Sequence, residues 1–281
     1  MTWLIFGKTG QVATALSARL PQAVLLGRDK ADLSDPQACA DAINAHAPSL
    51  VINAAAYTAV DQAEDEETLA TTINGTAPGA MATTCAARGI PFLHISTDYV
   101  FDGTGDAPWT PDAPTGPLGA YGRSKLAGEQ AVVAAGGAHC VLRTAWVFSA
   151  TGGNFVKSML RLAETRDRLT IVADQFGAPT EAGDIADALI TMGHALLDDP
   201  GKTGIYHFSG APYTNWDGFA REIFAHAGKS VEVVDIPSSD FPTKATRPGN
   251  SRLDCTSLEQ RFGIKQPDWR TSLSRVVTEL T

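Results

Sequence analysis

Cysteine is scarce in this chain, with four among 281 residues: Cys39, Cys85, Cys140 and Cys255. They lie far apart, and no two have the short spacing of a zinc site or a redox dithiol. A disulfide framework therefore does not hold the fold together. We expect reduced, mostly buried thiols of the kind found in cytoplasmic proteins. A catalytic cysteine is the alternative that this pattern leaves open.

Long apolar runs and an excess of positive charge are also missing. No apolar run approaches the roughly 20 residues of a membrane span, and the start "TWLIF" is too short, without a basic flank, for a signal peptide. Lysine and arginine number 22 against 31 acidic residues, a formal charge of −9. That balance argues against nucleic-acid binding, which needs a basic surface. We expect a cytoplasmic protein with no membrane or nucleic-acid partner, although a few cations or a helix N-terminus could still bind a small anion.

The first half alternates short apolar runs with helical patterns, which predicts an α/β fold with a doubly wound parallel sheet. The strands are expected at Trp3–Phe6, Ala23–Leu26, Leu50–Asn53, Phe92–Ser96 and His139–Thr144. The helices are expected at Gln11–Arg19, Pro36–His46, Asn74–Arg88 and Tyr121–Ala135. The segment Gly103–Gly119 is rich in proline and glycine and is predicted to be a long functional loop.

Beyond residue 145 the alternation loosens, which indicates a second, smaller domain. We predict a nucleotide-binding domain over residues 1–145, with a return segment near 181–205, and a discontinuous substrate-binding cap over 146–281. Helices are expected near Phe155–Arg166, Asp184–Leu196 and Trp216–Ala227, strands at Ile205–Phe208 and Val231–Ile236, and a closing helix after the proline-containing stretch Pro237–Asn250.

The turn after the first strand, "LIFGKTGQVA", decides what kind of phosphate the chain binds. A triphosphate loop needs Gly-x-x-x-x-Gly-Lys-Ser/Thr, and Thr2 stands where its first glycine belongs. The pattern Gly7-x-x-Gly10-x-x-Ala13 instead fits a dinucleotide site: Gly7 permits the turn, Gly10 lets a diphosphate approach, and Ala13 lets the helix pack on the sheet. An ordinary strand-to-helix turn is the simpler alternative.

The end of the second strand, "LLGRDKADL", bears on cofactor choice. Many sites that prefer NAD place an acidic residue here for the ribose hydroxyls. Arg28 at this position could meet a 2′-phosphate, which favours NADPH, while Asp29 keeps NADH open. Arg28 as a solvated surface charge is the other interpretation.

Tyr121 and Lys125 in "YGRSKLAGE" are four residues apart on a predicted helix and share a face. An ordinary tyrosine pKa is about 10, and lowering it to about 7 with a nearby ammonium takes about 4 kcal/mol. Such a pair alone is equally typical of an exposed helix. Upstream, "FLHISTDYVFDG" ends a strand in Ser96-Thr97-Asp98, where a hydroxyl could bond a carbonyl oxygen as it gains charge. The small residues of "VINAAAYTAVD" would let a cofactor pass. Together these patterns predict proton delivery to a carbonyl reduced by a nicotinamide.

These segments resemble the extended short-chain dehydrogenase/reductase family. Within it they are most similar to the branch that reduces the 4-keto group of dTDP-6-deoxy-L-lyxo-4-hexulose to dTDP-L-rhamnose with NAD(P)H. The resemblance covers nearly the whole chain, and its cap segments carry the branch assignment: "LRTAWVFS", "NFVKSMLRLA", "DQFGAPT", "IYHFSG" and "PTKATRPGNSRLD". It implies a Rossmann domain with a small cap, and a dTDP-sugar as substrate.

The resemblance also assigns residues. Tyr121 would protonate the 4-oxygen, Lys125 would depress the Tyr121 pKa and bind the nicotinamide ribose, and Thr97 would polarise the carbonyl. Asn74 would support the catalytic helix. Cofactor contacts are expected from Tyr121 and Lys125 and also from Gly7, Gly10, Gln11, Val12, Arg28, Asp32, Leu33, Ala54, Ala55 and Ala56. Substrate contacts are expected from Thr58, Val60, Trp146, Asn154, Gln175, Arg247, Asn250 and Ser251. Arg247 is the favoured diphosphate ligand, whereas Trp146 could equally be a core tryptophan.

One departure from the resembled branch concerns Mg²⁺. Some members bind it between subunits through carboxylates of the first helix, the helix after "GAPT" and the C-terminus. The first two positions here are Ala15 and Gly183, and only Glu279 is acidic. Because such sites need several carboxylates, we expect no bound metal, and a monomer or a weak homodimer.

Two other functions remain open from the sequence. One is a catalytically silent relative, such as the regulatory subunit of methionine adenosyltransferase, which keeps the fold and the cofactor pocket. The other is a sugar-nucleotide epimerase or dehydratase on the same scaffold, which would retain NAD⁺ rather than consume NADPH.

Overall fold

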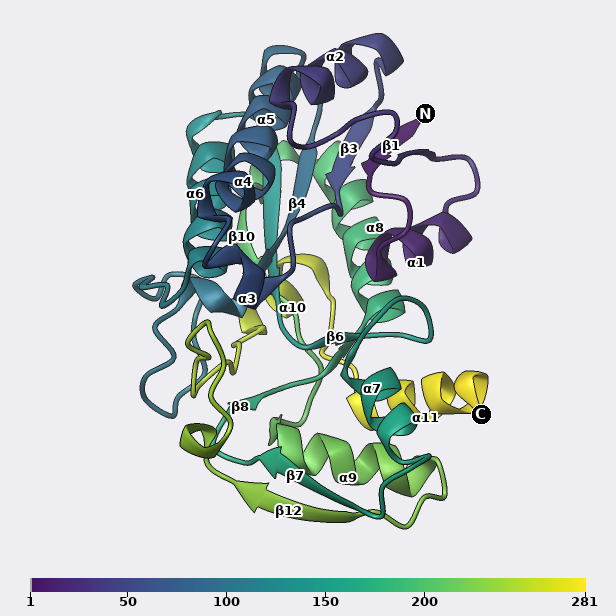
Figure 1. Cartoon of the computed structure of the whole chain (residues 1–281). Helices are drawn as coiled ribbons and strands as arrows, with labels where there is room; N and C mark the ends of the chain where they lie inside the picture. The colour runs from purple at the N-terminus through teal and green to yellow at the C-terminus, as the bar shows by residue number, and fades with distance from the viewer. Residues whose placement is uncertain (1) are drawn as a thin grey trace.

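The computed structural model describes residues 2–281 and contains a six-stranded parallel sheet with helices on both faces (Figure 1). The strand order is β10-β5-β4-β3-β1-β2. The order reverses at β1, with β2 on one side and β3 on the other, and ligands bind at the carboxyl edge of such a switch point. The predicted doubly wound α/β fold is confirmed. The strands are β1 (Trp3–Phe6), β2 (Val24–Leu26), β3 (Leu50–Asn53), β4 (Phe92–Thr97), β5 (His139–Thr144) and β10 (Gly204–His207).

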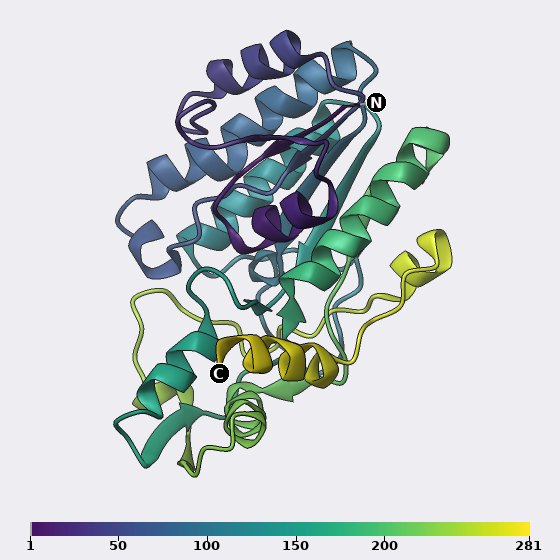
Figure 2. The same ribbon diagram turned by 90° about the vertical axis from the view of Figure 1, so that its right-hand side faces the viewer.

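Helices bury both faces of this sheet, so its strands are continuous apolar runs such as "WLIF". On one face lie α1 (Gln11–Arg19) and α8 (Ala182–Asp198), which face the viewer in Figure 2. The other face is covered by α2 (Pro36–His46), α5 (Ala77–Ala87) and α6 (Ala120–Ala134). Helix α10 (Thr256–Phe262) returns from the C-terminal part to pack Leu258 into the α1–α8 layer.

A second apolar core lies beyond the carboxyl edge of the sheet, in the lower part of Figure 1. Its largest fully buried side chains are Phe148, Phe219 and Trp269. The surrounding helices are α7 (Phe155–Leu162), α9 (Trp216–His226) and α11 (Trp269–Leu280), and β7 (Arg168–Val172) pairs in parallel with β12 (Glu232–Ile236). Short pairs complete this part: β6 (Val147–Phe148) with β9 (Thr180–Glu181), and β8 (Phe176–Gly177) with β11 (Thr214–Asn215).

The main local difference from prediction is the helix expected to begin at Asn74. Helical structure begins earlier: α3 (Val60–Ala63) is followed by α4 (Glu67–Thr71), a π-helical turn at Thr72–Thr76 and then α5. The stretch "TTINGT" is poor in strong helix formers, so the sequence did not predict a helical conformation there. Packing of this turn against α6 stabilises the helical conformation despite the low propensity. Strand β7 was also missed. Short 3₁₀ turns lie at Asp98–Val100, Pro200–Lys202 and Ser238–Asp240.

Two findings bear on the composition. All four cysteines are buried and unpaired, as predicted. Within residues 2–281, no helix combines the length and apolar character needed to cross a bilayer.

A buried ion pair ties α6 to the sheet. The Arg143 guanidinium on β5 donates to both carboxylate oxygens of Glu129 on α6, at 2.9 and 2.7 Å. Their side chains are 3% and 2% exposed. The Ser96 hydroxyl adds a third hydrogen bond to Glu129, at 2.5 Å. Each partner is therefore compensated, and removing one would leave the other charge buried.

Glu129→Gln should lower the free energy of unfolding by roughly 3 kcal/mol or more, because breaking a buried pair strands the Arg143 charge. Urea unfolding followed by circular dichroism measures the loss. Glu232→Gln is the control: its pair with Arg168 spans 3.8 Å with both side chains 62% exposed, so the midpoint should not move. Equal losses in the two variants would contradict this assignment.

Candidate active site

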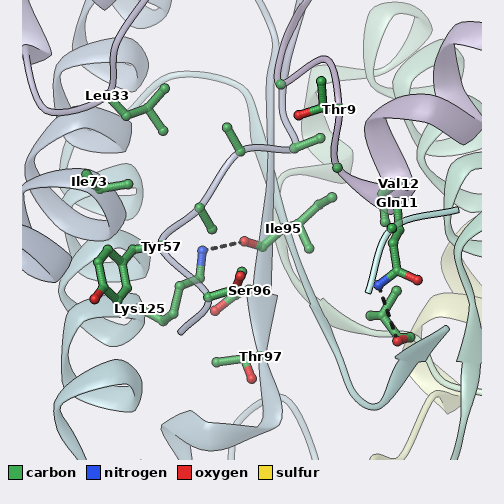
Figure 3. A pocket seen from close by; sticks show the side chains of 18 of the residues that line it. Thr9, Gln11, Val12, Leu33, Tyr57, Ile73, Ile95, Ser96, Thr97 and Lys125 are labelled. Atoms are coloured by element: carbon green, nitrogen blue, oxygen red, sulfur yellow. Dashed lines mark hydrogen bonds between the residues drawn. The ribbon is translucent and has the colours of Figure 1, made fainter. Parts of the chain in front are cut away.

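A cavity of about 1160 Å³ lies at the carboxyl ends of the central strands (Figure 3). Its walls come from the turn after β1, the end of β2, the loop after β3, the end of β4 and the first turns of α6. This volume exceeds that of pockets for drug-sized ligands. A dinucleotide together with a second small molecule would fit a space of this size. The π-helical turn, the end of β5 and the loop around β6 also contribute to the cavity walls. The cavity is lined by residues 7–12, 26–29, 31–33, 54–58, 60, 73, 95–99, 121, 125, 144–147, 152 and 153.

The glycine turn is shaped for a diphosphate. Gly7 has φ +111°, and a Cβ there would lie 3.2 Å from the Ala54 backbone. A Cβ at Gly10 would meet no atom within 4 Å, so that side is open. Gly10 is the N-cap of α1 and supplies no side-chain cap, which leaves the first N–H groups free to bind an anion. The predicted contacts Gly7, Gly10, Gln11 and Val12 all line the cavity.

Charged residues that follow β2 form one wall of the cavity. Arg28 is 80% exposed, and its Nε donates to Asp32 Oδ2 at 2.9 Å. The Ser34 backbone N–H and then Arg28 lower the pKa of Asp32. Both residues line the cavity, together with Leu33 and Asp29. The contact with a 2′-phosphate that the sequence suggested for Arg28, and its alternative as a solvated surface charge, both fit this exposed position.

Thr97 and Tyr121 meet at the inner end of the cavity. Thr97 ends β4, and its Oγ1 donates to Asp98 Oδ1 at 3.0 Å. Tyr121 lies in the first turn of α6, edge-on to Tyr99 with ring centroids 5.5 Å apart. Burial raises the pKa of Tyr121, and the Thr97 hydroxyl only partly opposes that shift. The phenol is therefore neutral around pH 7.

The contacts of Lys125 differ from those that the sequence predicted. Its Nζ donates to the Ile95 carbonyl at 2.7 Å (Figure 3). The same Nζ lies 3.2 Å from His94 Nε2. Burial lowers the pKa of Lys125 to about 8, while Glu129 acts in the opposite direction. The sequence predicted that this ammonium would acidify Tyr121. The Lys125 side chain instead crosses to β4, and the largest influence on the pKa of Tyr121 is burial, which raises it.

Asn74 anchors the catalytic helix from the π-helical turn. Its Oδ1 accepts from Tyr57 N at 2.8 Å, and its Nδ2 donates to Tyr57 O and to Ser124 Oγ, both at 2.9 Å. Ser124 lies on α6 and donates to the Tyr121 carbonyl at 2.7 Å. Asn74 thus contacts the helix that it was expected to support. π-Turns of this kind often occur at functional sites.

Asp98 is a polar cavity residue to which the sequence gave no role of its own. It is 2% exposed, and its Oδ2 has no hydrogen-bond partner within residues 2–281. Burial raises the pKa of Asp98 to about 6, while the Ser251 and Thr97 hydroxyls act against that rise. His94 was missed as well. The available signal was polar residues at alternate positions of a buried strand, His94 and Ser96 in "FLHIST", which both face α6.

Three predicted substrate residues line the cavity: Thr58, Val60 and Trp146. Trp146 has φ +48°, a conformation that a bulky side chain rarely adopts. Its indole stacks on Trp216, with centroids 3.8 Å apart and planes 14° from parallel. Gly177 lies against the same ring, where a Cβ would come within 2.8 Å. The surroundings therefore hold Trp146 in a strained position at the cavity wall.

The other predicted substrate residues lie outside the cavity lining, and two of them brace the cap. Asn154 caps α7 and donates to Gln11 Oε1 at 2.9 Å and Ser149 O at 2.7 Å. Gln175 donates to Ser238 Oγ at 2.9 Å and accepts from Trp216 Nε1 at 3.1 Å.

The remaining three belong to the segment after the proline-containing stretch. Arg247 donates to Asp61 Oδ2 at 2.6 Å. Asn250 is buried and donates to the Thr104 and Ala107 carbonyls, at 3.3 and 2.8 Å. Ser251 is buried beside Asp98.

The surface near Ala15 and Gly183 carries a cation. Arg19 pairs with Asp187 at 2.6 Å, and its guanidinium lies where a Cβ on Gly183 would be. Over the described part of the chain, no three His, Cys, Asp or Glu side chains gather closely enough to hold a metal ion.

A family profile, curated relatives and solved structures all match this chain to the same protein family. The profile described as "RmlD substrate binding domain" matches residues 1–281. The dTDP-4-dehydrorhamnose reductase of Sinorhizobium fredii is 44% identical, covering 100% of this chain and 98% of the relative. The structure of a Clostridium acetobutylicum dTDP-4-dehydrorhamnose reductase superposes with TM-score 0.93 at 34% identity, covering 100% and 99% of the two chains. That of Bacillus anthracis, solved in complex with NADP, gives 0.91 at 32% identity, covering 99% of each. The chain therefore belongs to the RmlD family, the dTDP-4-dehydrorhamnose reductases.

Proposed function

We propose that this chain reduces the 4-keto group of dTDP-6-deoxy-L-lyxo-4-hexulose to dTDP-L-rhamnose with NADPH. The observation that carries the proposal is the meeting of Thr97 and Tyr121 in one cavity with an open glycine turn and a basic residue at the end of β2. The names of the relatives and the NADP complex of the Bacillus anthracis structure support the same reaction.

The glycine turn would hold the diphosphate, and Arg28 the 2′-phosphate. The other predicted cofactor contacts, Asp32, Leu33, Ala54, Ala55 and Ala56, line the same walls. When bound, NADPH supplies the hydride that C4 accepts. Lys125 would leave the Ile95 carbonyl to bind the nicotinamide ribose.

Tyr121 acts as the acid. Reduction of a ketone requires one proton on the oxygen, and a neutral phenol carries it. A phenol is protonated around pH 7, and its transfer of a proton becomes favourable as the 4-oxygen develops alkoxide character. Thr97 would turn its hydroxyl from Asp98 to the same oxygen and stabilise the developing charge. After the proton leaves, the phenolate is the group that must be reprotonated.

The sugar nucleotide would lie between these residues and the cap. Thr58, Val60 and Trp146 would line the hexose pocket, and Arg247 would exchange Asp61 for a diphosphate that it can bond in a bidentate manner. Asn154, Gln175, Asn250 and Ser251 are already bonded within the chain, so their contribution would be to hold the walls in place.

The proposal includes a monomer or a weak homodimer that needs no Mg²⁺. Ala15 and Gly183 supply no carboxylate, and Glu279 alone is too few ligands. Four unpaired thiols suit a cytoplasmic enzyme. A stable dimer in sedimentation that dissociates when a chelator is added would contradict the proposal that the protein is a monomer or a weak homodimer without Mg²⁺.

Tyr121→Phe should lower kcat for the dTDP-keto sugar by about 10²- to 10⁴-fold, the usual contribution of a general acid. NADPH affinity, measured by fluorescence, should change less than about twofold, because the substitution removes only the hydroxyl and keeps the ring. Tyr206→Phe is the matched control, since Tyr206 bonds Lys202 O at the far end of the sheet. An unaffected rate in Tyr121→Phe would reject the assigned acid. Net NADPH consumption by the parent protein separates a reductase from an epimerase, a dehydratase or a silent binding subunit.

Arg28→Ala should weaken NADPH binding at least about tenfold, because a hydrogen bond to a charged group contributes about 1.5–3 kcal/mol. NADH lacks the 2′-phosphate, so its dissociation constant should stay nearly unchanged. Titration calorimetry with both dinucleotides measures the difference. Lys30→Ala removes the same charge two residues away, outside the cavity lining, and should leave both affinities unchanged. Equal losses for NADPH and NADH would place Arg28 on the solvated surface instead.

A further inference from the structure

His94 lies directly behind the catalytic lysine. It is fully buried on β4, with Nε2 3.2 Å from Lys125 Nζ and Nδ1 3.1 Å from Asn53 Nδ2. Burial holds the pKa of His94 well below its usual range. The imidazole is therefore neutral and carries a single N–H.

Asn53 decides where that proton lies. Its Oδ1 accepts from the Ala55 backbone N–H at 3.1 Å, which fixes the orientation of the amide. The atom facing His94 is then Nδ2, which can only donate. His94 Nδ1 must accept, so the imidazole proton is on Nε2 and faces Lys125.

This geometry has a consequence for the charge of Lys125. An ammonium has three donors and no lone pair, so Nε2–H facing it would place two donors together. A neutral amine can accept from His94 Nε2–H and still donate to the Ile95 carbonyl. The observed contacts are therefore all satisfied only when Lys125 is uncharged.

The surrounding charges do not offset this effect. One turn along α6, Glu129 favours the ammonium, but its oxygens already accept from Arg143 on β5 and Ser96 on β4. The loop after β3 presents Tyr57, whose hydroxyl donates to Glu66. Earlier on α6, Tyr121 is neutral. Burial of Lys125 acts in the same direction as His94.

We propose that His94 is a positioning residue that favours the neutral amine of Lys125 against the Ile95 carbonyl, and that at alkaline pH Lys125 gains a proton when the dinucleotide site fills. The proposal rests on the proposed function, because it needs Lys125 to leave His94 for the cofactor. Filling the site would bring the ribose hydroxyls to Lys125 as hydrogen-bond acceptors, within a cavity that then holds a dinucleotide of net negative charge, and both favour the ammonium.

The test is the number of protons taken up on NADPH binding at pH 9, from calorimetry in two buffers of different ionisation enthalpy. With a Lys125 pKa of about 8 before binding and an ordinary value once bound, the parent protein should take up about 0.9 proton per site. In His94→Gln an amide oxygen can accept from the ammonium, so the uptake should fall below about half that value. Lys125→Met should abolish the uptake, whatever its effect on affinity.

His139→Gln is the matched control. His139 is a buried histidine on β5 that contacts the Gly137 carbonyl and not Lys125, so its uptake should equal that of the parent. NADPH binding without proton uptake at pH 9, or the same uptake in His94→Gln as in the parent, would overturn the proposal. Absence of NADPH binding would instead overturn the proposed function, so the two failures are distinguishable.

Discussion

The site depends on how closely α6 approaches the sheet and the π-helical turn. A Cβ on Gly128 would overlap the Asn74 carbonyl, and one on Gly122 would overlap the Tyr99 carbonyl. Only glycine permits these contacts, and they bring Asn74 within hydrogen-bonding distance of Ser124. The Glu129–Arg143 pair fixes the same helix farther along. Tyr121 and Lys125 are placed by these constraints rather than by contacts of their own.

Close packing has an electrostatic consequence. It removes water from Lys125, His94 and Asp98, and burial is the largest cause of their pKa shifts and of that of the partly buried Tyr121. Burial disfavours charge in every case, which raises the pKa of Tyr121 and lowers that of Lys125. Tyr121 thus stays protonated around pH 7, and the Lys125 ammonium loses its proton at a lower pH than an ordinary lysine.

The fold was predictable because its signals are local. Apolar runs such as "LVIN" and glycine patterns such as Gly7-x-x-Gly10 report strands and a turn without reference to distant residues. The cavity residues at strand ends followed from the same reasoning, since parallel strands bring their carboxyl ends to one edge. Trp146 lines the cavity, but its stacking on Trp216 joins positions 70 residues apart and left no local pattern. The Asn53–His94–Lys125 contacts likewise join two strands and a helix. Asn154 was indistinguishable from a ligand residue until its bond to Gln11 was seen.

The fold alone serves many reactions, so the account's distinctive claim is the protonation state of Tyr121. Labelling the tyrosine ring at Cζ with ¹³C and titrating the protein by NMR reads that state directly, with the Tyr121→Phe spectrum assigning the resonance. The account predicts that the Tyr121 signal keeps the shift of a neutral phenol up to at least about pH 10. A Tyr121 signal that titrates with a midpoint near about pH 7 in the ligand-free protein would contradict it.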